Sequence, residues 1–228
     1  MDRDQLKAQA AAAAVDEVAS GTVLGLGTGS TAAHAVREIG SRLADGRLRD
    51  IRGIPTSIAT ADLARQVGIP LIEPGAAPID LAIDGADEIA PDLALTKGGG
   101  GALLREKVIA AAAERFAVIA DDSKVVSALG STFDIPVEIA QFGLGITMEA
   151  LRELGNPQLR GGDEPFVSDN GNYIVDLAVA PIGVPGAFDS ALTAIPGVLA
   201  TGLFVGIADV AYVAGASGLR RLDVAGRV

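Results

Sequence analysis

The chain has 228 residues, of which 49% are hydrophobic and 21% are charged, so it has enough apolar material for a sizeable core and is not intrinsically disordered. Its formal net charge of −11 disfavours nucleic acid as the main partner, because binding to a phosphate backbone needs a basic surface. The chain has no cysteine and one histidine, which excludes disulfides, thiolate metal sites and multi-histidine metal sites and leaves only a carboxylate Mg²⁺ site open.

The N-terminal residues lack the features of a targeting signal. Residues 1–4 have neither the basic nor the apolar region of a signal peptide. No uninterrupted apolar run approaches the length of a membrane span. We therefore expect a cytoplasmic protein without a membrane partner.

The first predicted elements are a helix over residues 2–19 and a buried strand over 22–26. Lys7 on this helix is interpreted as a charge facing solvent; the alternative is that it reaches a ligand. The turn Gly-Thr-Gly-Ser-Thr comes next, and a second helix begins near Ala32. Backbone N–H groups and the hydroxyls of Ser30 and Thr31 can donate to phosphate oxygens. The glycine spacing fits neither a Walker loop nor a dinucleotide site, which favours a small phosphate. Alternatively, Ser30 or Thr31 only caps the helix; His34, early in that helix, is interpreted as structural or supporting.

An acidic loop comes after the next group of predicted elements, which are strands over 51–55, 70–72 and 79–83 and a helix over 58–67. The loop reads Asp-Gly-Ala-Asp-Glu at 84–88. Ligands of open α/β sheets lie at the carboxyl ends of the strands, so Asp84 and Asp87 are candidate ligand contacts. The alternative is a polar turn that only caps the next element of the chain.

A glycine run at residues 98–101 lies between Lys97 and a predicted helix over 102–114. Such a run at a helix start can direct several N–H groups at one anion. Lys97 adds a positive charge, and Glu106 adds a carboxylate early in the helix. We therefore expect chemistry on a phosphorylated or carboxylated small molecule, with Asp84, Asp87, Lys97 and Glu106 close together. The alternative is a flexible loop followed by a solvated helix face.

The alternation of strands and helices between residues 20 and 125 predicts an α/β fold with a doubly wound, mostly parallel sheet. Its last strand, over 116–120, is followed by Lys124, a third candidate on the ligand side. From about residue 130 the pattern is α+β, with strands over 136–139 and 173–177 and helices over 146–154 and 187–194. Residues 204–228 return to strand character and are expected to rejoin the first sheet.

Four short motifs, in their order and spacing, resemble type A ribose-5-phosphate isomerase over essentially the whole chain. They are Gly-Thr-Gly-Ser-Thr at 27–31, Asp-Gly-Ala-Asp-Glu at 84–88, Lys-Gly-Gly-Gly at 97–100 with Arg-Glu-Lys at 105–107, and Asp-Ser-Lys at 122–124. The sequence departs from the family pattern at Gly101, where alanine is frequent, and at Asp122, where a small residue is frequent.

The resemblance implies a Rossmann-like catalytic domain, residues 1–129 and 204–228, and a smaller α+β lid or oligomerisation domain, residues 130–203. It implies no metal or nucleotide cofactor, a pentose phosphate as substrate, and a homodimer or homotetramer. It assigns the base to Glu106, with Asp84, Asp87 and Lys97 as further catalytic residues. The substrate-binding residues that it implies are Thr28, Gly29, Ser30, Thr31, Asp84, Gly85, Ala86, Asp87, Lys97, Gly98, Gly99, Gly100 and Lys124.

The implied activity is the interconversion of D-ribose 5-phosphate and D-ribulose 5-phosphate through an enediolate, a step of the non-oxidative pentose phosphate pathway. One carboxylate can remove and return the proton, and we expect burial to raise the pKa of Glu106 above the ordinary value of about 4.3. Two alternatives remain: a non-catalytic sugar-phosphate sensor, and a CoA or acyl transferase on a related scaffold. A sensor of the repressor type would carry a basic DNA-binding segment, which this acidic chain lacks.

Overall fold

The computed structural model describes residues 2–223, which form two compact units. Unit 1 contains residues 2–86, 105–124 and 207–223, and unit 2 contains residues 87–104 and 125–206. Residues 87–104, which the sequence analysis grouped with the catalytic domain, cluster with unit 2 because their short strands pair there. The division into a catalytic domain and a lid domain stays a prediction. Residues 224–228, at the end of the segment expected to have strand character, lie outside the described residues.

Unit 1 is built on a six-stranded sheet in the order β13-β12-β6-β3-β1-β2. Neighbouring strands are parallel from β12 to β2, and β13 runs antiparallel to β12. The expected α/β fold with a mostly parallel sheet is thereby confirmed, and the C-terminal strands do rejoin this sheet. The bounds are β1 (Val23–Leu26), β2 (Arg52–Pro55), β3 (Leu81–Gly85), β6 (Phe116–Asp121), β12 (Val210–Gly215) and β13 (Gly218–Asp223).

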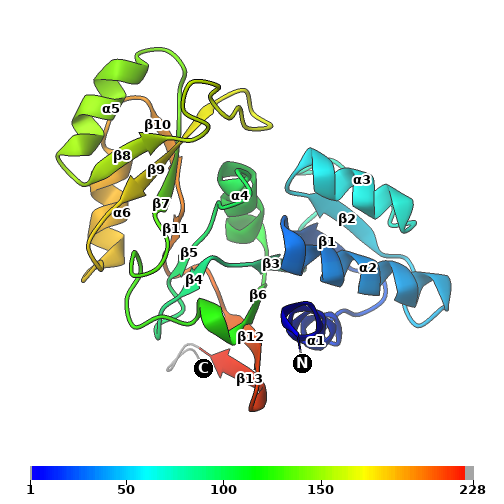
Figure 1. The fold of residues 1–228 in the computed structure, drawn as a ribbon. Coiled ribbons are helices and arrows are strands. Elements are labelled where there is room, and N and C mark those ends of the chain that lie inside the picture. Colours follow the sequence, from blue (N-terminus) through cyan, green and yellow to red (C-terminus); the bar gives the residue numbers. More distant parts are fainter. Residues whose placement is uncertain (1, 224–228) are drawn as a thin grey trace. The chain divides into compact units, whose positions relative to one another are not determined.

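Helices cover both faces of this sheet (Figure 1). Leu24 and Leu26 of β1 pack into a core with residues of α1, α2 and α3. Gly25 between them faces the other way, where a Cβ atom would lie 2.5 Å from Ile109 of α4. Since successive strand residues point to opposite faces, the sheet is doubly wound. The bounds are α1 (Arg3–Val15), α2 (Ser30–Ala44), α3 (Ile58–Gln66) and α4 (Leu103–Ala112).

Two predicted elements differ from those observed. The helix expected over 2–19 begins with a capping box between Asp2 and Gln5 but ends at Val15, because the following amides of Glu17 and Val18 bond three residues back rather than four. The strand expected over 70–72 is reduced to a single bridge between Leu71 and Gly53.

Unit 2 contains two antiparallel sheets and two helices (Figure 1). The four-stranded sheet has the order β10-β7-β9-β8, and the three-stranded sheet has the order β11-β5-β4. Helices α5 and α6 bury Leu151 and Leu192 in one core with Val137 and Val175 of the larger sheet. The bounds are β4 (Glu88–Ile89), β5 (Leu95–Thr96), β7 (Ile135–Ile139), α5 (Leu144–Arg152), β8 (Asn156–Leu159), β9 (Tyr173–Ala178), α6 (Pro185–Thr193), β10 (Val198–Thr201) and β11 (Leu203–Phe204).

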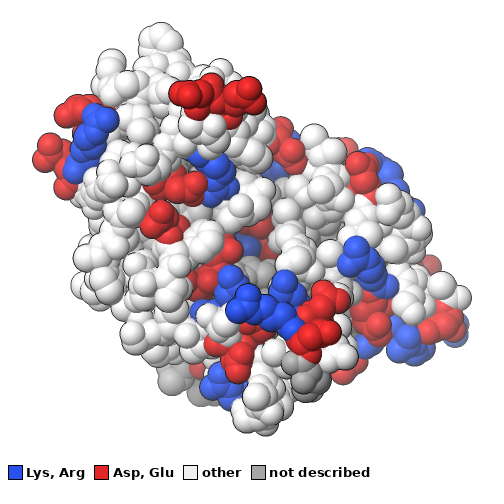
Figure 2. Space-filling model, viewed as in Figure 1, with Lys and Arg blue, Asp and Glu red and all other residues white. Residues whose placement is uncertain are grey.

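The visible surface carries mixed charge. On the face shown in Figure 2, lysine and arginine side chains are interspersed with acidic side chains. Within residues 2–223, no helix is long and apolar enough to cross a lipid bilayer.

Candidate functional site

The order of the parallel strands sets the position of the first half of the site. Strands β1 and β3 are neighbours, while the chain passes from β1 to the outer strand β2 before it returns. The carboxyl ends of β1 and β3 therefore flank the point where the strand order reverses, which is where ligands bind in open α/β sheets. The Thr28 amide donates a hydrogen bond to Asp84 Oδ1 at 3.0 Å, so the turn after β1 and the end of β3 are joined there.

The hydroxyl of Thr28 lies in a cluster of hydroxyl groups. Its Oγ1 is 2.7 Å from Thr56 Oγ1, 2.9 Å from Ser57 Oγ and 3.2 Å from Thr60 Oγ1. Thr60 also donates to the carbonyl oxygen of Gly27 at 2.9 Å. These bonds hold the turn in place and fix the position of Thr28, whose contact with the substrate stays a prediction.

The amino end of α2 comes directly after this turn. Gly29 occupies the N-cap position with a φ of 104°, a left-handed conformation that favours glycine, and no side chain of the described residues caps the helix. The alternative in which Ser30 or Thr31 only caps this helix is therefore wrong. Both residues lie in the first turn, where helical amides lack partners within the helix and the dipole favours an anion.

Lys7 was interpreted mainly as a solvent charge and was left out of the predicted site residues. Its Nζ lies 2.9 Å from Ser30 Oγ, so α1 brings a positive charge to the amino end of α2. The side chain is half-buried rather than fully in solvent. Its contact with Ser30 spans 23 positions and depends on how α1 packs, so no local sequence signal pointed to it.

Asp84 and Glu106 line the same small pocket of unit 1. It is a narrow cavity with about 160 Å³ of empty space and no room for a water molecule, and Gly27 and Thr56 also contribute to its wall. Asp84 is 4% exposed and Glu106 is 4% exposed, so both carboxylates are largely withdrawn from water. Two candidates that are 22 positions apart in the sequence thus meet at the reversal point of the sheet.

Gly27 determines how closely the turn approaches Asp84. A Cβ atom at this position would lie 2.6 Å from Asp84 Cα and closer still to its carboxylate. Because any other side chain would push Asp84 away, glycine is needed here for close approach of two backbones.

Lys124 is the last residue of the short helix η1 (Asp122–Lys124), which follows β6. The strand β6 is the neighbour of β3, so Lys124 follows the carboxyl end of the next strand along the sheet. Asp121 is 2% exposed and accepts hydrogen bonds from the amide and the hydroxyl of Ser123, which fixes this turn. Gly85 and Ala86, at and after the end of β3, are half-buried.

Unit 2 holds the remaining candidates, Asp87, Lys97 and the glycine run. The Lys97 side chain is 2% exposed, and its Nζ lies 5.4 Å from the centroid of the Phe204 ring. Burying an ammonium group costs free energy because its hydration is lost, and attraction to the face of an aromatic ring offsets part of this free energy. Asp87 accepts a hydrogen bond from the Gly99 amide at 2.8 Å. Asp87, Lys97 and the run are therefore assembled within one unit.

Only part of the run has the left-handed backbone that glycine alone adopts easily. Gly98 has a φ of 107° and Gly101 a φ of 77°, and the Gly101 amide donates to the Gly98 carbonyl oxygen at 2.9 Å. At Gly99 a Cβ atom would lie 2.9 Å from the Asp87 carboxylate. The run therefore forms a turn with a defined hydrogen bond.

Glu88, beside Asp87, has a different role. It is fully buried and accepts hydrogen bonds from Thr96 Oγ1, from the Thr132 amide and hydroxyl, and from the amides of Gly130 and Phe133. These bonds connect β4, β5 and the segment before β7. Glu88 is therefore a structural residue of unit 2.

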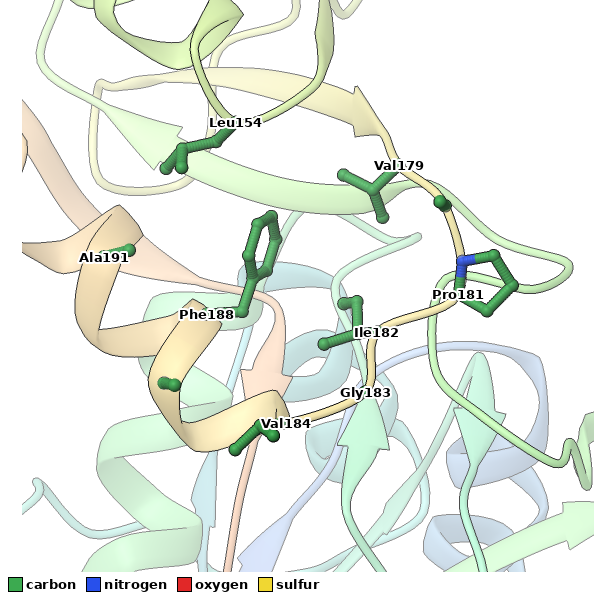
Figure 3. A pocket seen from close by; sticks show the side chains of 10 residues that line it. Leu154, Val179, Pro181, Ile182, Gly183, Val184, Phe188 and Ala191 are labelled. Carbon is green, nitrogen blue, oxygen red and sulfur yellow. The ribbon is translucent and has the colours of Figure 1, made fainter.

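A larger pocket, with about 450 Å³ of space that water-sized molecules can occupy, lies in unit 2 (Figure 3). It is lined by apolar side chains of α6 and of the segment before it, including Ile182, Val184 and Phe188. None of the candidate catalytic or binding residues contributes to it. Among residues 2–223, no three acidic or histidine side chains gather as a metal site would require.

Comparison with known proteins identifies the family. The model of the family described as ribose 5-phosphate isomerase A (phosphoriboisomerase A) matches residues 52–218. Ribose-5-phosphate isomerase A of Roseiflexus castenholzii is 49% identical over 227 residues, covering 98% of this chain and 97% of that protein. The Deinococcus radiodurans protein of the same name is 46% identical, with coverages of 97% and 99%.

Solved structures agree with this. A D-ribose-5-phosphate isomerase in complex with phospho-erythronic acid has a TM-score of 0.95 at 36% identity, covering 98% of this chain and all of that one. Ribose 5-phosphate isomerase of Plasmodium falciparum has a TM-score of 0.93 at 38% identity, with coverages of 96% and 98%. Similarity over the full length of isomerases does not support the sensor or the transferase alternative. This chain belongs to the ribose 5-phosphate isomerase A family.

Proposed function

We propose that this chain interconverts D-ribose 5-phosphate and D-ribulose 5-phosphate, with Glu106 as the base that moves the proton. The observation that carries this proposal is that the largely buried carboxylates of Glu106 and Asp84 line one narrow cavity beside the turn at residues 27–31. A carboxylate in a pocket that is closed to bulk water can act on a C–H group without competition from solvent.

The phosphate of the substrate binds at the amino end of α2. The amides of the first turn lie there, with the Ser30 hydroxyl 2.9 Å from the Lys7 ammonium group and Thr31 next in the same turn, and each of these groups favours an anion. This region supplies local positive potential in a chain whose net charge is −11. The sugar then extends from α2 toward Asp84 and Glu106.

The proton transfer is dictated by the chemistry of the open-chain sugar. Glu106 takes the proton from C2 of the aldose, and the electron pair forms the C1–C2 double bond of an enediolate. Protonated Glu106 returns the proton to C1, while the proton of the C2 hydroxyl passes to O1, which leaves a ketone at C2 and a hydroxyl at C1. No oxidant or reductant is consumed.

The negative charge that develops on O1 and O2 needs positive charge or N–H donors beside it. We assign this role to Lys97 and to amides of the glycine run. Asp84 and Asp87 bind sugar hydroxyls, and one of them assists ring opening and the transfer between O2 and O1. Gly85, Ala86 and Lys124 complete the binding site, and the division of labour between Lys97 and Lys124 is a question for mutagenesis.

The ligand of the solved relative fits this proposal. Phospho-erythronic acid carries a phosphate and a carboxylate, and the planar carboxylate with two oxygens resembles the C1–C2 enediolate in shape and charge. A site that binds phosphate at one end and stabilises an enediolate at the other would hold such a molecule more tightly than the substrate.

We further propose that the protein acts in the cytoplasm as a homodimer or homotetramer, as the family resemblance implies. Light scattering on the purified protein measures the assembly directly, and a monomer at working concentration would contradict the proposal.

The activity is tested by proton NMR of ribose 5-phosphate with the purified protein in D₂O containing EDTA. Growth of ribulose 5-phosphate signals, with deuterium entering at the exchanged carbon, supports proton transfer by an amino-acid side chain. Absence of conversion, with ribose 5-phosphate still bound, would favour the sensor alternative and refute the proposal.

A further inference from the structure

A guanidinium group holds the glycine turn of unit 2 from the side opposite Asp87. Arg160 Nη1 donates to the carbonyl oxygen of Gly98 at 3.0 Å and to that of Gly99 at 3.3 Å. The same side chain lies over the Phe166 ring, with Cζ 5.9 Å from the ring centroid. Phe166 also packs on Gly101, where a Cβ atom would lie 2.5 Å from the ring.

Arg160 is itself held by Asp176. Its Nε donates to Asp176 Oδ2 at 2.9 Å, and its Nη2 donates to the other carboxylate oxygen. The side chains of Arg160 and Asp176 are 18% and 26% exposed. A planar guanidinium can bind a carboxylate with one edge and carbonyl oxygens with the remaining N–H group, which a lysine cannot do. The pair therefore forms a rigid support.

The direction of two peptide groups is set by these bonds. In a trans peptide the C=O and the next N–H point in opposite directions. The Gly98 carbonyl points to Arg160, and the Gly99 amide accordingly points to Asp87, to which it donates at 2.8 Å. The Gly99 carbonyl also faces Arg160, so the Gly100 amide is directed away from the guanidinium, toward the side on which Asp87 lies.

We infer that Arg160 is a positioning residue of the isomerase, which orients the glycine turn so that the Gly99 amide holds Asp87 and the Gly100 amide faces the sugar. The inference rests on the proposed function, because that function makes Asp87 and the glycine amides part of the substrate site. Arg160 acts through the turn and does not itself contact the substrate. Its loss should weaken binding of the sugar portion and leave phosphate binding at α2 unchanged.

The test compares Arg160→Met and Arg160→Lys with Arg152→Met, which removes an exposed arginine paired with Glu149 on α5 of the same unit. Turnover and calorimetric binding of ribose 5-phosphate, the inhibition constant of inorganic phosphate, and the unfolding midpoint are measured for each. Removing hydrogen bonds from a charged group should lower kcat/KM by about 10- to 100-fold in Arg160→Met. The kcat/KM of Arg160→Lys should lie between that of Arg160→Met and that of the parent, and the kcat/KM of Arg152→Met should equal that of the parent.

Inorganic phosphate separates a local effect from a general one. An unchanged phosphate inhibition constant together with weaker ribose 5-phosphate binding supports the inference. An Arg160→Met protein whose kcat/KM is within twofold of the parent overturns it, as does a parallel loss of phosphate and sugar binding, which would show general damage. If Arg160→Met does not fold, the same measurements on Arg160→Lys are judged by the same criteria. The parent enzyme's turnover tests the proposed function separately, and sugar binding tests the inference whether or not turnover occurs.

Discussion

The replacement Gly27→Ala examines whether the position of Asp84 controls catalysis. The new Cβ atom would lie 2.6 Å from Asp84 Cα, and ordinary van der Waals contact begins at 3.4 Å. The two backbones must therefore separate by about 0.8 Å, and rotation of the Asp84 side chain cannot avoid this. The hydrogen bond from the Thr28 amide to Asp84 Oδ1, now 3.0 Å, would be stretched or broken.

This displacement should change both stability and rate. Overpacking of this kind costs about 1–3 kcal/mol of stability. Misplacement of a catalytic group by about 1 Å lowers the rate by about 100-fold. The free energy of unfolding is measured with urea. The kcat/KM is measured with ribose 5-phosphate in one direction and with ribulose 5-phosphate in the other. We expect loss of activity well beyond what the fraction of unfolded protein explains.

Gly40→Ala is the matched control. A Cβ atom on this residue of α2 would lie 2.5 Å from Val67 Cβ, so the replacement creates a comparable clash in the core of unit 1 away from Asp84. It should lower stability while the folded protein keeps its kcat/KM. If Gly27→Ala retained kcat/KM within threefold of the parent, or if Gly40→Ala lost as much activity, the assignment of Asp84 to the reaction would be refuted.

Three further predictions concern single side chains. Glu106→Gln should lower kcat by at least about 1000-fold and leave the KM nearly unchanged, because the amide keeps the shape but cannot accept the proton; near-normal turnover by rapid-quench assay would remove Glu106 as the base. Lys7→Met should raise both the KM for ribose 5-phosphate and the inhibition constant of inorganic phosphate by about 10-fold, because a charged partner of the phosphate is lost; unchanged constants would mean that Lys7 faces solvent in the complex. Burial raises the pKa of the Glu17 carboxyl, but hydrogen bonds from Arg115 and Tyr212 outweigh it and hold the pKa below its ordinary value. The ion pair therefore stabilises the folded state above the unfolded-state pKa of about 4.3, and this stability is lost as the pH falls through the lower folded-state pKa. Glu17→Gln should accordingly cost about 1 kcal/mol at pH 7 and much less at pH 3, and an equal cost in urea unfolding at both pH values would contradict the linkage.

The first half of the site was predictable because its signals are local. A buried strand, a glycine turn and a helix succeed one another within residues 22–44, and each step has its own chemical signature in the sequence. The sheet then brings Asp84 to the same place through β1–β3 pairing; the alternation of strands and helices predicts a parallel sheet but does not specify this order of strands. Lys7 was missed because its contact with Ser30 spans 23 positions and depends on how α1 packs, which periodicity does not specify.

The scaffold of unit 2 was harder to predict. The strands β4, β5 and β11 are two residues long, too short for any alternation to appear in the sequence. Strand β11 also comes from more than 100 positions after β5. Arg160 carried no motif at all, and its relation to the glycine turn depends on side-chain packing between segments about 60 positions apart.

The acidic loop shows why residue type alone could not assign roles. Three carboxylates within five positions look alike in the sequence, and distant partners separate them. Asp84 accepts from the Thr28 amide at the reversal point of the parallel sheet, and Asp87 accepts from the Gly99 amide in the glycine turn. Glu88 is withdrawn into unit 2, where the Thr132 amide and hydroxyl are among its donors. The loop therefore holds one residue of the proposed proton-transfer site, one residue of the proposed sugar-binding turn, and one structural residue. Asp84→Asn should accordingly lower kcat, Asp87→Asn should weaken sugar binding, and Glu88→Gln should lower the free energy of unfolding.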